Sequence, residues 1–481
     1  MRSTVKIGRV FDAKNTMRRF IALLLLFGSF GTQAQTQPER FALRKGVILD
    51  SLPVTDAFAK TLKLYLPRDF ENTRTWPLIF ICVEKEQALQ TMRSMVGAAE
   101  KSGFILAATE AMADTLSLTN KVLRINTGLE KLRAYLPLNL RRIYTSGYDM
   151  GGQLATLVPS LIRPVRGVLS IGSGLGTPEL IGDSGTFEFV GVMGRADYQY
   201  SDMRAAEEFL DRKKIRNHVF YHTGGHQWPD ARYIDLGMQA LTLMAMKDPG
   251  GEKDMEYVRS SYQDFRDYIG ALEAGGDLLL ALDQVEEGLS LYDGLIDTDW
   301  LKDKRKELRK NRAYRAQKRD WEQARVQELM LTEDYGFYLA EDVNSFNLNN
   351  LGWWRYQMEK IDNYKNSDDG EEQLMGQRLE GYLNALISDF IDAYGLGEKP
   401  DDDALILLHM LKTITDPENY DHYLKVISYT AKYGDFGTAN FYLEELLKRG
   451  YTDADGLYTL PHTGLLRISP EFNKLVAQYL G

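Results

Sequence analysis

The chain has 481 residues, of which 44% are hydrophobic and 26% are charged, so its composition excludes a disordered or fibrous protein. The net charge of -10 is unevenly distributed, because residues 1–250 hold 32 basic and 24 acidic residues whereas residues 251–481 hold 26 and 44. The acidic second half argues against nucleic acid as its main partner. The single cysteine, Cys82, excludes an intramolecular disulfide and a cysteine-based metal site.

The first residues have the pattern of an export signal. Two arginines precede a short apolar run, residues 20–27, and small residues with the spacing of a signal-peptidase site follow at Thr32 and Ala34. We therefore expect residues 1–34 to be a signal peptide, with Met17 as an alternative start, and the protein to be exported to the periplasm or the extracellular space. The apolar run is too short to span a bilayer.

Short apolar runs then alternate with helical patterns. The predicted strands are residues 61–67, 77–83, 103–108, 142–146, 165–171, 187–193 and 218–221. Helical periodicity covers residues 119–136 and 231–246. Strands separated by helices predict a mostly parallel sheet with helices on both faces. Cys82 falls inside an apolar run and is expected to be a buried strand residue.

The character of the chain changes at residues 248–251, a predicted linker with the sequence Asp-Pro-Gly-Gly. Helical spacing dominates beyond it, so we expect an α/β domain over residues 35–248 and an all-α domain over residues 252–481. Within the second, residues 302–319 are rich in lysine and arginine and predict one highly charged helix. A solvated helix face is the preferred interpretation, and a binding patch is the alternative.

A motif that carries chemistry follows the strand predicted at 142–146. The segment Gly147-Tyr148-Asp149-Met150-Gly151 has the spacing of the nucleophile elbow G-x-S-x-G, with an aspartate at the centre. In that elbow the central residue occupies a strained turn between a strand and a helix, and the small flanking residues let the two approach closely.

An acidic residue and a histidine follow two later strands. Asp197 lies in the segment Gly194-Arg195-Ala196-Asp197, and His226 lies in a glycine-flanked loop after the last predicted strand. The order of nucleophile, acid and histidine is that of the α/β hydrolases. The structural alternatives are a turn-capping role for Asp197 and a core position for His226.

On these motifs, residues 40–246 resemble the α/β-hydrolase superfamily, in particular secreted esterases related to feruloyl esterases and polyhydroxybutyrate depolymerases. The resemblance implies that Asp149 occupies the position of the serine nucleophile, Asp197 that of the orienting acid and His226 that of the general base. It implies no cofactor and no metal ion.

The aspartate at the elbow is the first departure from that pattern. Attack of a carboxylate on an ester carbonyl would give a mixed anhydride, which is a poor route to hydrolysis. A carboxylate nucleophile suits displacement at an alkyl carbon, as in haloalkane dehalogenases and epoxide hydrolases. Those families usually have tryptophan after the aspartate and a helical cap domain, whereas Met150 follows here and residues 175–186 are too few for a cap.

The second departure is the oxyanion loop, where Glu84-Lys85-Glu86-Gln87 replaces the glycine-rich turn that such hydrolases place after this strand. Without glycine, the close backbone approach that forms an oxyanion hole is not expected. Ordinary serine-esterase activity is therefore not expected. Two alternatives remain open, an active hydrolase that uses Asp149, Asp197 and His226 as a modified triad, and a cation held by Asp149 and Asp197 beside His226.

The end of the chain offers one more resemblance. Residues 429–450 contain two helical patterns joined at Gly434-Asp435, with alanines where helices would touch, and are similar to a tetratricopeptide-type hairpin. This resemblance implies a surface for a protein or peptide partner. A purely structural bundle is the alternative.

Overall fold

The computed structural model describes residues 44–53, 61–83, 87–109, 116–181, 187–396 and 400–481. The predicted signal peptide, residues 1–34, lies outside these ranges. Within them, no helix combines the length and the apolar character needed to cross a membrane.

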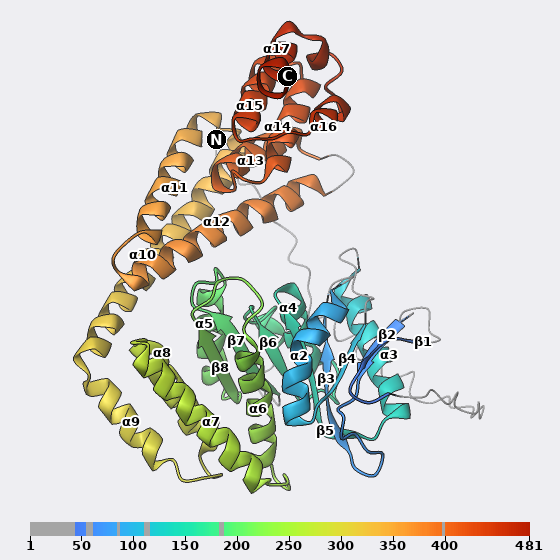
Figure 1. The fold of residues 1–481 in the computed structure, drawn as a ribbon, viewed down its shortest axis with the longest axis vertical. Coiled ribbons are helices and arrows are strands. Elements are labelled where there is room, and N and C mark those ends of the chain that lie inside the picture. Colours follow the sequence, from blue (N-terminus) through green and yellow to red (C-terminus); the bar gives the residue numbers. More distant parts are fainter. Residues whose placement is uncertain (1–43, 54–60, 84–86, 110–115, 182–186, 397–399) are drawn as a thin grey trace, which may run out of the picture. The chain divides into compact units, whose positions relative to one another are not determined.

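One eight-stranded sheet organises the first half of the chain, in the order β1-β2-β4-β3-β5-β6-β7-β8 (Figure 1). The strands are β1 (Ile48–Pro53), β2 (Thr61–Tyr65), β3 (Trp76–Ile81), β4 (Ile105–Thr109), β5 (Leu138–Tyr148), β6 (Gly167–Ile171), β7 (Glu188–Gly194) and β8 (Asn217–His222). β1 and β2 pair antiparallel, as do β2 and β4, and every other pair is parallel. The predicted mostly parallel sheet is confirmed.

Strands β3, β6 and β7 are buried along their whole length, because helices cover both faces of the sheet. All six residues of β3 are buried, and Cys82, which follows it directly, is buried too. The Cys82 N–H donates to the Ser146 carbonyl at 2.7 Å, so this residue extends the pairing with β5. Burial raises the pKa of the Cys82 thiol to about 12, as expected for a structural residue rather than a reactive one.

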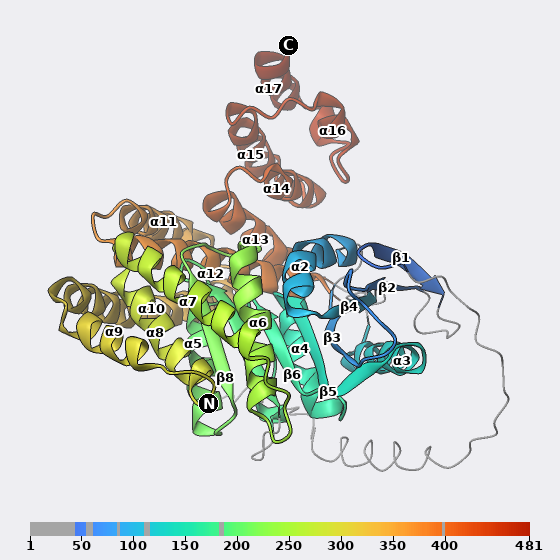
Figure 2. The ribbon, with the colours of Figure 1, turned by 60° about the horizontal axis from the view of Figure 1, so that its bottom comes forward.

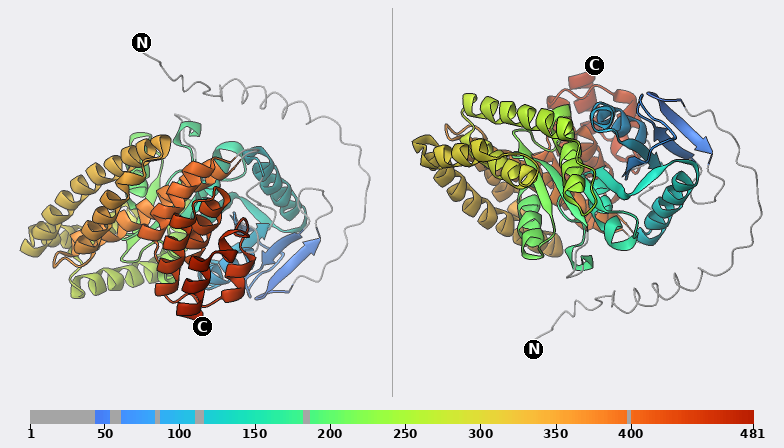
Figure 3. Two further views of the ribbon diagram at one scale, coloured as in Figure 1. Left: turned by 90° about the horizontal axis from the view of Figure 1, so that it is seen from above. Right: turned by 90° about the horizontal axis from the view of Figure 1, so that it is seen from below.

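Helices lie on both sides of the sheet (Figures 2 and 3). The five that cover it are α2 (Ala88–Ser102), α3 (Leu118–Tyr135), α4 (Met150–Leu161), α5 (Tyr200–Arg212) and α6 (Ala231–Lys247). α2 and α6 pack together and share one hydrophobic core with the inward side chains of β3, β6 and β7. On the other side, Gly128 of α3 lies against Phe80, and Met203 of α5 lies against Gly191 of β7.

Three further helices continue this core past the predicted linker. They are α7 (Met255–Ala274), α8 (Leu278–Tyr292) and α9 (Asp299–Lys310). Phe265 of α7 and Val285 of α8 are buried in the same cluster as Phe220 of β8 and Leu241 of α6. The hydrophobic core is therefore continuous across residues 248–251.

The basic stretch predicted as one helix over residues 302–319 is divided between two helices, α9 and α10 (Arg312–Ser345). The break falls at Asn311, whose backbone is extended (φ -63°, ψ 132°) and whose side chain accepts a hydrogen bond from the Ala313 N–H at 2.8 Å. Asparagine is a favoured N-cap, so it starts a new helix where charge periodicity alone predicts continuation. Some α9 cations pair with acids of neighbouring helices, as Arg309 does with Glu286, and others with acids of α9 itself, as Lys306 does with Asp303.

The helices of the remaining chain pack on one another, mostly on their neighbours in sequence, although α12 also packs on α10 and α17 on α15. They are α11 (Leu351–Lys365), α12 (Gly370–Gly395), α13 (Asp402–Thr415), α14 (Tyr420–Lys432), α15 (Phe436–Lys448), α16 (Ala454–Thr459) and α17 (Pro470–Leu480), with short 3₁₀ turns at Pro178–Leu180, Leu348–Asn350 and Leu466–Ile468. α10 to α13 share one buried cluster, and α13 to α17 share another. The helix-rich second half is confirmed, and the hairpin predicted at Gly434-Asp435 is formed by α14 and α15.

Candidate functional site

The elbow predicted at Asp149 is present between β5 and α4. Asp149 has φ 50° and ψ -122°, a backbone conformation that residues other than glycine rarely adopt. Its N–H donates to the Ile171 carbonyl at 3.0 Å, and its carbonyl accepts from the Gln153 N–H at 2.9 Å. These two bonds hold the strained turn between the strand and the helix.

Glycines make this turn possible by close packing. A Cβ at Gly147 would lie 2.2 Å from the Gly151 carbonyl oxygen, and one at Gly151 would lie 2.3 Å from the Cys82 carbonyl oxygen. Both distances are far inside van der Waals contact, so neither position accepts a side chain without a shift of the backbone. The spacing noticed in the sequence therefore has the steric cause that the motif requires.

Asp197 and His226 meet beside the elbow. Asp197 follows β7 and is almost completely buried, and His226 follows β8. The His226 Nδ1 lies 3.0 and 3.1 Å from the two Asp197 carboxylate oxygens. Asp197 also accepts the Gln199 N–H at 2.9 Å, so it caps its own turn as well as orienting the histidine.

Asp149 faces the other ring nitrogen of this histidine. The His226 Nε2 lies 3.8 Å from the Asp149 Oδ1, which is an ion-pair distance and too long for a hydrogen bond. The same Oδ1 accepts a hydrogen bond from the Gln199 side-chain amide at 2.7 Å. Asp149, Asp197 and His226 thus lie together, while their role in catalysis stays a prediction.

Gln199 is a site residue that the sequence analysis did not single out. It is buried, and its side chain connects the acid turn to the elbow. The available signal was its position two residues after Asp197. Because Asp149 is 50 residues away in sequence, the contact could not be inferred from local spacing.

Aromatic rings enclose the histidine. The ring centroid of His226 is 4.6 Å from that of Tyr198 and 5.4 Å from that of Tyr148, and Trp228 packs on Tyr148 at 5.6 Å. An imidazolium placed against tyrosine rings is favoured by their electron-rich faces. Burial together with the nearby carboxylates raises the pKa of Tyr198 to about 12, so its phenol stays neutral.

The charges of the site stabilise one another. Burial disfavours a charged histidine, but the carboxylates of Asp149 and Asp197 outweigh it and raise the pKa of His226 to about 9. Burial also opposes the ionised form of Asp149, but His226, the Gln199 amide and the Met150 N–H together lower the pKa of that carboxyl. At neutral pH the site therefore holds the ionised Asp149 carboxylate beside the imidazolium of His226.

This charge state limits what the site can do. A protonated His226 cannot accept a proton as a general base. Of the two carboxylates, that of Asp149 is partly open to solvent, with about a third of its side chain exposed. That of Asp197 is almost completely buried. A ligand at the elbow would thus meet an anionic hydrogen-bond acceptor.

The geometry of the site tests the hypothesis that Asp149 and Asp197 hold a cation beside His226. Asp197 faces Nδ1 of His226 and Asp149 faces Nε2, so the two carboxylates do not converge on one point. In the described part of the chain, no group of three or more His, Cys, Asp or Glu side chains could hold a metal ion. Glu84-Lys85-Glu86, the core of the predicted glycine-free loop, lies outside the described residues.

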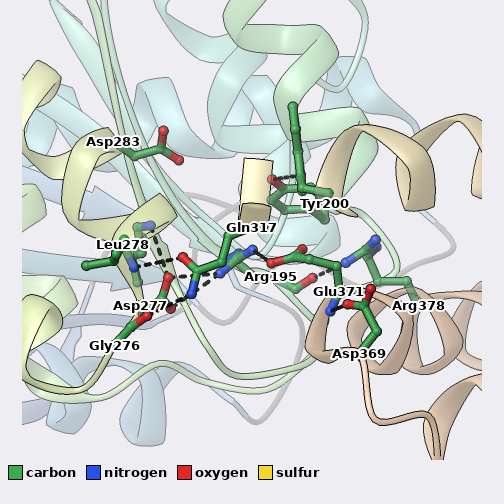
Figure 4. Close-up of polar contacts among 12 residues, drawn as sticks. Arg195, Tyr200, Gly276, Asp277, Leu278, Asp283, Gln317, Asp369, Glu371 and Arg378 are labelled. Atoms are coloured by element: carbon green, nitrogen blue, oxygen red, sulfur yellow. Dashed lines mark hydrogen bonds and ion pairs between the residues drawn. The ribbon is translucent and has the colours of Figure 1, made fainter. Parts of the chain in front are cut away.

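The acid turn also anchors the helices of the second half. Arg195 lies between Asp277, at the start of α8, and Glu371 of α12, at 3.2 and 2.6 Å (Figure 4). Its carbonyl accepts a hydrogen bond from Arg378 of α12 at 2.6 Å, and Arg378 pairs with Glu328 of α10. Arg378 and Glu328 are both buried. The turn that holds Asp197 is therefore fixed by three helices from outside the sheet.

Four features identify the architecture: the strand order, the elbow after β5, the acid after β7 and the histidine after β8. The first half of the chain has the α/β-hydrolase fold. Asp149 lies at the turn between β5 and α4, and its correspondence to the nucleophile of such hydrolases stays a prediction.

Comparisons with known proteins agree with this fold and add nothing to the chemistry. No family model matches the chain, and no curated protein matches it in sequence. The solved structures compared match at 11 to 14% identity, which shows likeness of fold alone, and their TM-scores of 0.30 to 0.36 support no further conclusion.

Three of these structures illustrate the match. An esterase from the archaeon Pyrobaculum calidifontis aligns over 42% of this chain and 87% of its own, with a TM-score of 0.35. Esterase B from Lactobacillus rhamnosis aligns over 43% and 89%, with a TM-score of 0.36. With a dipeptidyl aminopeptidase IV-type protein from Bacteroides ovatus, the TM-score is 0.30, and the match covers 37% of this chain and only 32% of that one.

Proposed function

We propose that this chain is an exported α/β-hydrolase-fold protein that binds a ligand at the Asp149 site without ordinary serine-esterase activity. One observation carries the proposal: the elbow presents a carboxylate that faces the triad histidine and accepts a hydrogen bond from Gln199. A serine triad requires a neutral histidine to remove the hydroxyl proton. Here there is no hydroxyl, and the histidine is held as a cation between two anions.

The location and the helical half belong to the same proposal. The arginines, apolar run and small residues of the first 34 positions support export to the periplasm or the extracellular space. The packing of α11 on α12, α12 on α13, α13 on α14 and α14 on α15 supports a helical interaction module, because stacked hairpins present extended surfaces to protein or peptide partners.

Ester hydrolysis tests the central claim. The purified protein should hydrolyse p-nitrophenyl acetate and butyrate no faster than its His226→Ala variant does. His462→Ala is the matched control, since His462 is exposed and its ring takes no part in the site. Esterase turnover that the His226 substitution abolishes and the His462 substitution spares would refute the proposal.

A second candidate function is nucleophilic displacement by Asp149. The observation that favours it is the retained strain at Asp149, whose φ of 50° presents the side chain as a nucleophile elbow does. The carboxylate would displace a leaving group from an alkyl carbon, and water activated by His226 would then hydrolyse the resulting ester. Because the second step needs neutral His226, turnover would rise with pH up to about 9.

Intact-protein mass spectrometry distinguishes the two candidates. After incubation with a haloalkane and epoxide panel, a covalent alkyl adduct that maps to Asp149 and disappears in Asp149→Asn would establish displacement. Unmodified protein at every pH between 6 and about 9.5 would exclude it for those substrates.

A further inference from the structure

A groove of about 720 Å³ lies between helix α5 and helix α10. Asp202 and Ala205 line it from α5, and Val326 and Leu329 line it from α10. Tyr382 of α12 also lines it, and its hydroxyl donates to the Thr332 carbonyl at 3.3 Å. The two helices are linked by the Arg325–Glu208 ion pair and by the hydrogen bond from Trp321 to Tyr200, so the groove has a defined width.

The α10 wall continues into an exposed apolar stripe. Val326, Leu329, Met330 and Phe337 are each 56 to 69% exposed. Their spacing of three, four and eleven residues from Val326 places them on one face of the helix. A run of large apolar side chains left open to water on one helix face marks an interaction surface. Val326 and Leu329 belong to both the groove and the stripe.

The charged residues that line the groove are mostly acidic. Asp202 and Glu333 line it, as does Glu322, which lies 3.6 Å from Lys318, whereas the one described cation of its lining, Arg325, pairs with Glu208. A fifth acid, Glu328, is neutralised by Arg378. An apolar floor with an anionic rim attracts cationic groups and repels acidic ones.

We propose that this groove and the adjoining α10 stripe bind a cationic amphipathic segment of a partner protein. Apolar side chains of the segment, spaced as on one helix face, contact Val326, Leu329 and Met330, and its lysines or arginines contact the acidic rim. The proposal goes beyond the function proposed above, and it holds whether or not Asp149 is catalytic.

Tyr198 connects this groove to the elbow site. It lines the groove, its ring lies 4.6 Å from that of His226, and its hydroxyl accepts a hydrogen bond from Gln199 at 3.3 Å. A segment that occupies the groove therefore contacts a residue packed on the triad histidine. Binding should change the imidazole NMR signals of His226, which gives a readout besides affinity.

Titration with a synthetic probe tests the proposal. The probe is a fluorescein-labelled amphipathic peptide of leucine and lysine, and the control peptide carries glutamate at each lysine position. With the full chain at physiological salt, we expect saturable binding of the lysine peptide in fluorescence anisotropy, weaker binding as salt is raised, and no binding of the glutamate peptide.

Two matched substitutions locate the binding surface. Leu329→Lys should weaken binding by about tenfold or more. Leu465→Lys is the control, because Leu465 is also 69% exposed but lies outside the groove. Circular dichroism should show that both variants fold, since both positions are on the surface. Glu333→Lys should weaken binding as well and reduce its salt dependence.

Three outcomes of the peptide titrations would overturn the proposal. They are absence of binding by the lysine peptide, equal weakening by Leu329→Lys and Leu465→Lys, and binding of the glutamate peptide with similar affinity. Concentration-dependent dimerisation that Leu329→Lys abolishes would also overturn it, because the stripe would then be covered by a second copy of this chain.

Discussion

At the residue scale, the charge of His226 decides what the site can do. Two carboxylates flank the ring, Asp197 at Nδ1 and Asp149 at Nε2. In a serine triad only the acid is anionic in the resting state, so the histidine stays available as a base. On the proposed function, Asp149 takes the place of that serine, so the histidine faces a carboxylate on each side and forms an ion pair with Asp149.

This change predicts a pH dependence of stability. The pKa of His226 is about 9 in the folded protein and about 6.5 when unfolded, so its contribution is complete below pH 6.5 and is lost as pH rises to about 9. Measured by urea unfolding, the wild-type protein should lose on the order of 2 kcal/mol across that window relative to His226→Gln. His462→Asn, at an exposed position with φ 64°, should retain the wild-type slope. Parallel curves for wild type and His226→Gln would contradict the prediction.

At the scale of elements, the strand–turn–helix unit around Asp149 depends on two glycines. Gly151→Ala would place a methyl group 2.3 Å from the Cys82 carbonyl oxygen, so we expect a loss of stability of about 3 kcal/mol or more. Gly97→Ala in α2 is the control, because nothing lies within 4 Å of its Cβ position and alanine favours a helix by about 0.5 to 1 kcal/mol. Thermal unfolding of both variants checks this contrast. An unchanged stability of Gly151→Ala would show that the turn has room for a methyl group at residue 151.

Helices α10 and α12 are joined to the acid turn by buried charges. Arg378→Met leaves Glu328 buried and unpaired, so we expect the free energy of unfolding to fall by about 3 to 5 kcal/mol. The double variant Arg378→Met with Glu328→Leu should recover part of this loss. The Arg309–Glu286 pair has the same 2.6 Å distance but is exposed, so Arg309→Met should cost less than about 1 kcal/mol. Urea unfolding measures both losses. If Arg378→Met and Arg309→Met lower the free energy of unfolding equally, burial of the Arg378–Glu328 pair does not affect stability.

For the whole molecule, the sequence predicts those features that depend on residues close together in the chain. The elbow, the acid turn and the histidine loop each have a local pattern, and the hydrolase order places them at one edge of the sheet. The Arg195–Glu371 pair joins residues 176 positions apart, and no periodicity or spacing in either segment indicates it. Asn311 is the opposite case. Its N-cap role depends on a local signal, but the run of charged residues around it predicted one unbroken helix.

The same contrast applies to the division of the chain. A change of composition at residues 248–251 predicts a boundary between two domains, and that boundary stays a prediction. The packing shows why composition alone is a weak guide here. Val258, Phe265 and Ile269 of α7 and Val285 of α8 are buried in one cluster with the sheet and α6, although they follow the linker.

Truncation tests whether residues 35–248 fold alone. A chain that ends at residue 250 lacks these four side chains, each of which contributes about 1.5 to 3 kcal/mol by burial. Their sum is comparable to the entire stability of a typical domain, about 5 to 15 kcal/mol, so this fragment should be unfolded or aggregated. A chain that ends at residue 311 keeps α7 to α9 and should unfold cooperatively with near-ultraviolet circular dichroism signals. If the shorter fragment melts at the same temperature as the longer one, the boundary at the linker is a true folding boundary, and α7 to α9 belong with the helical half.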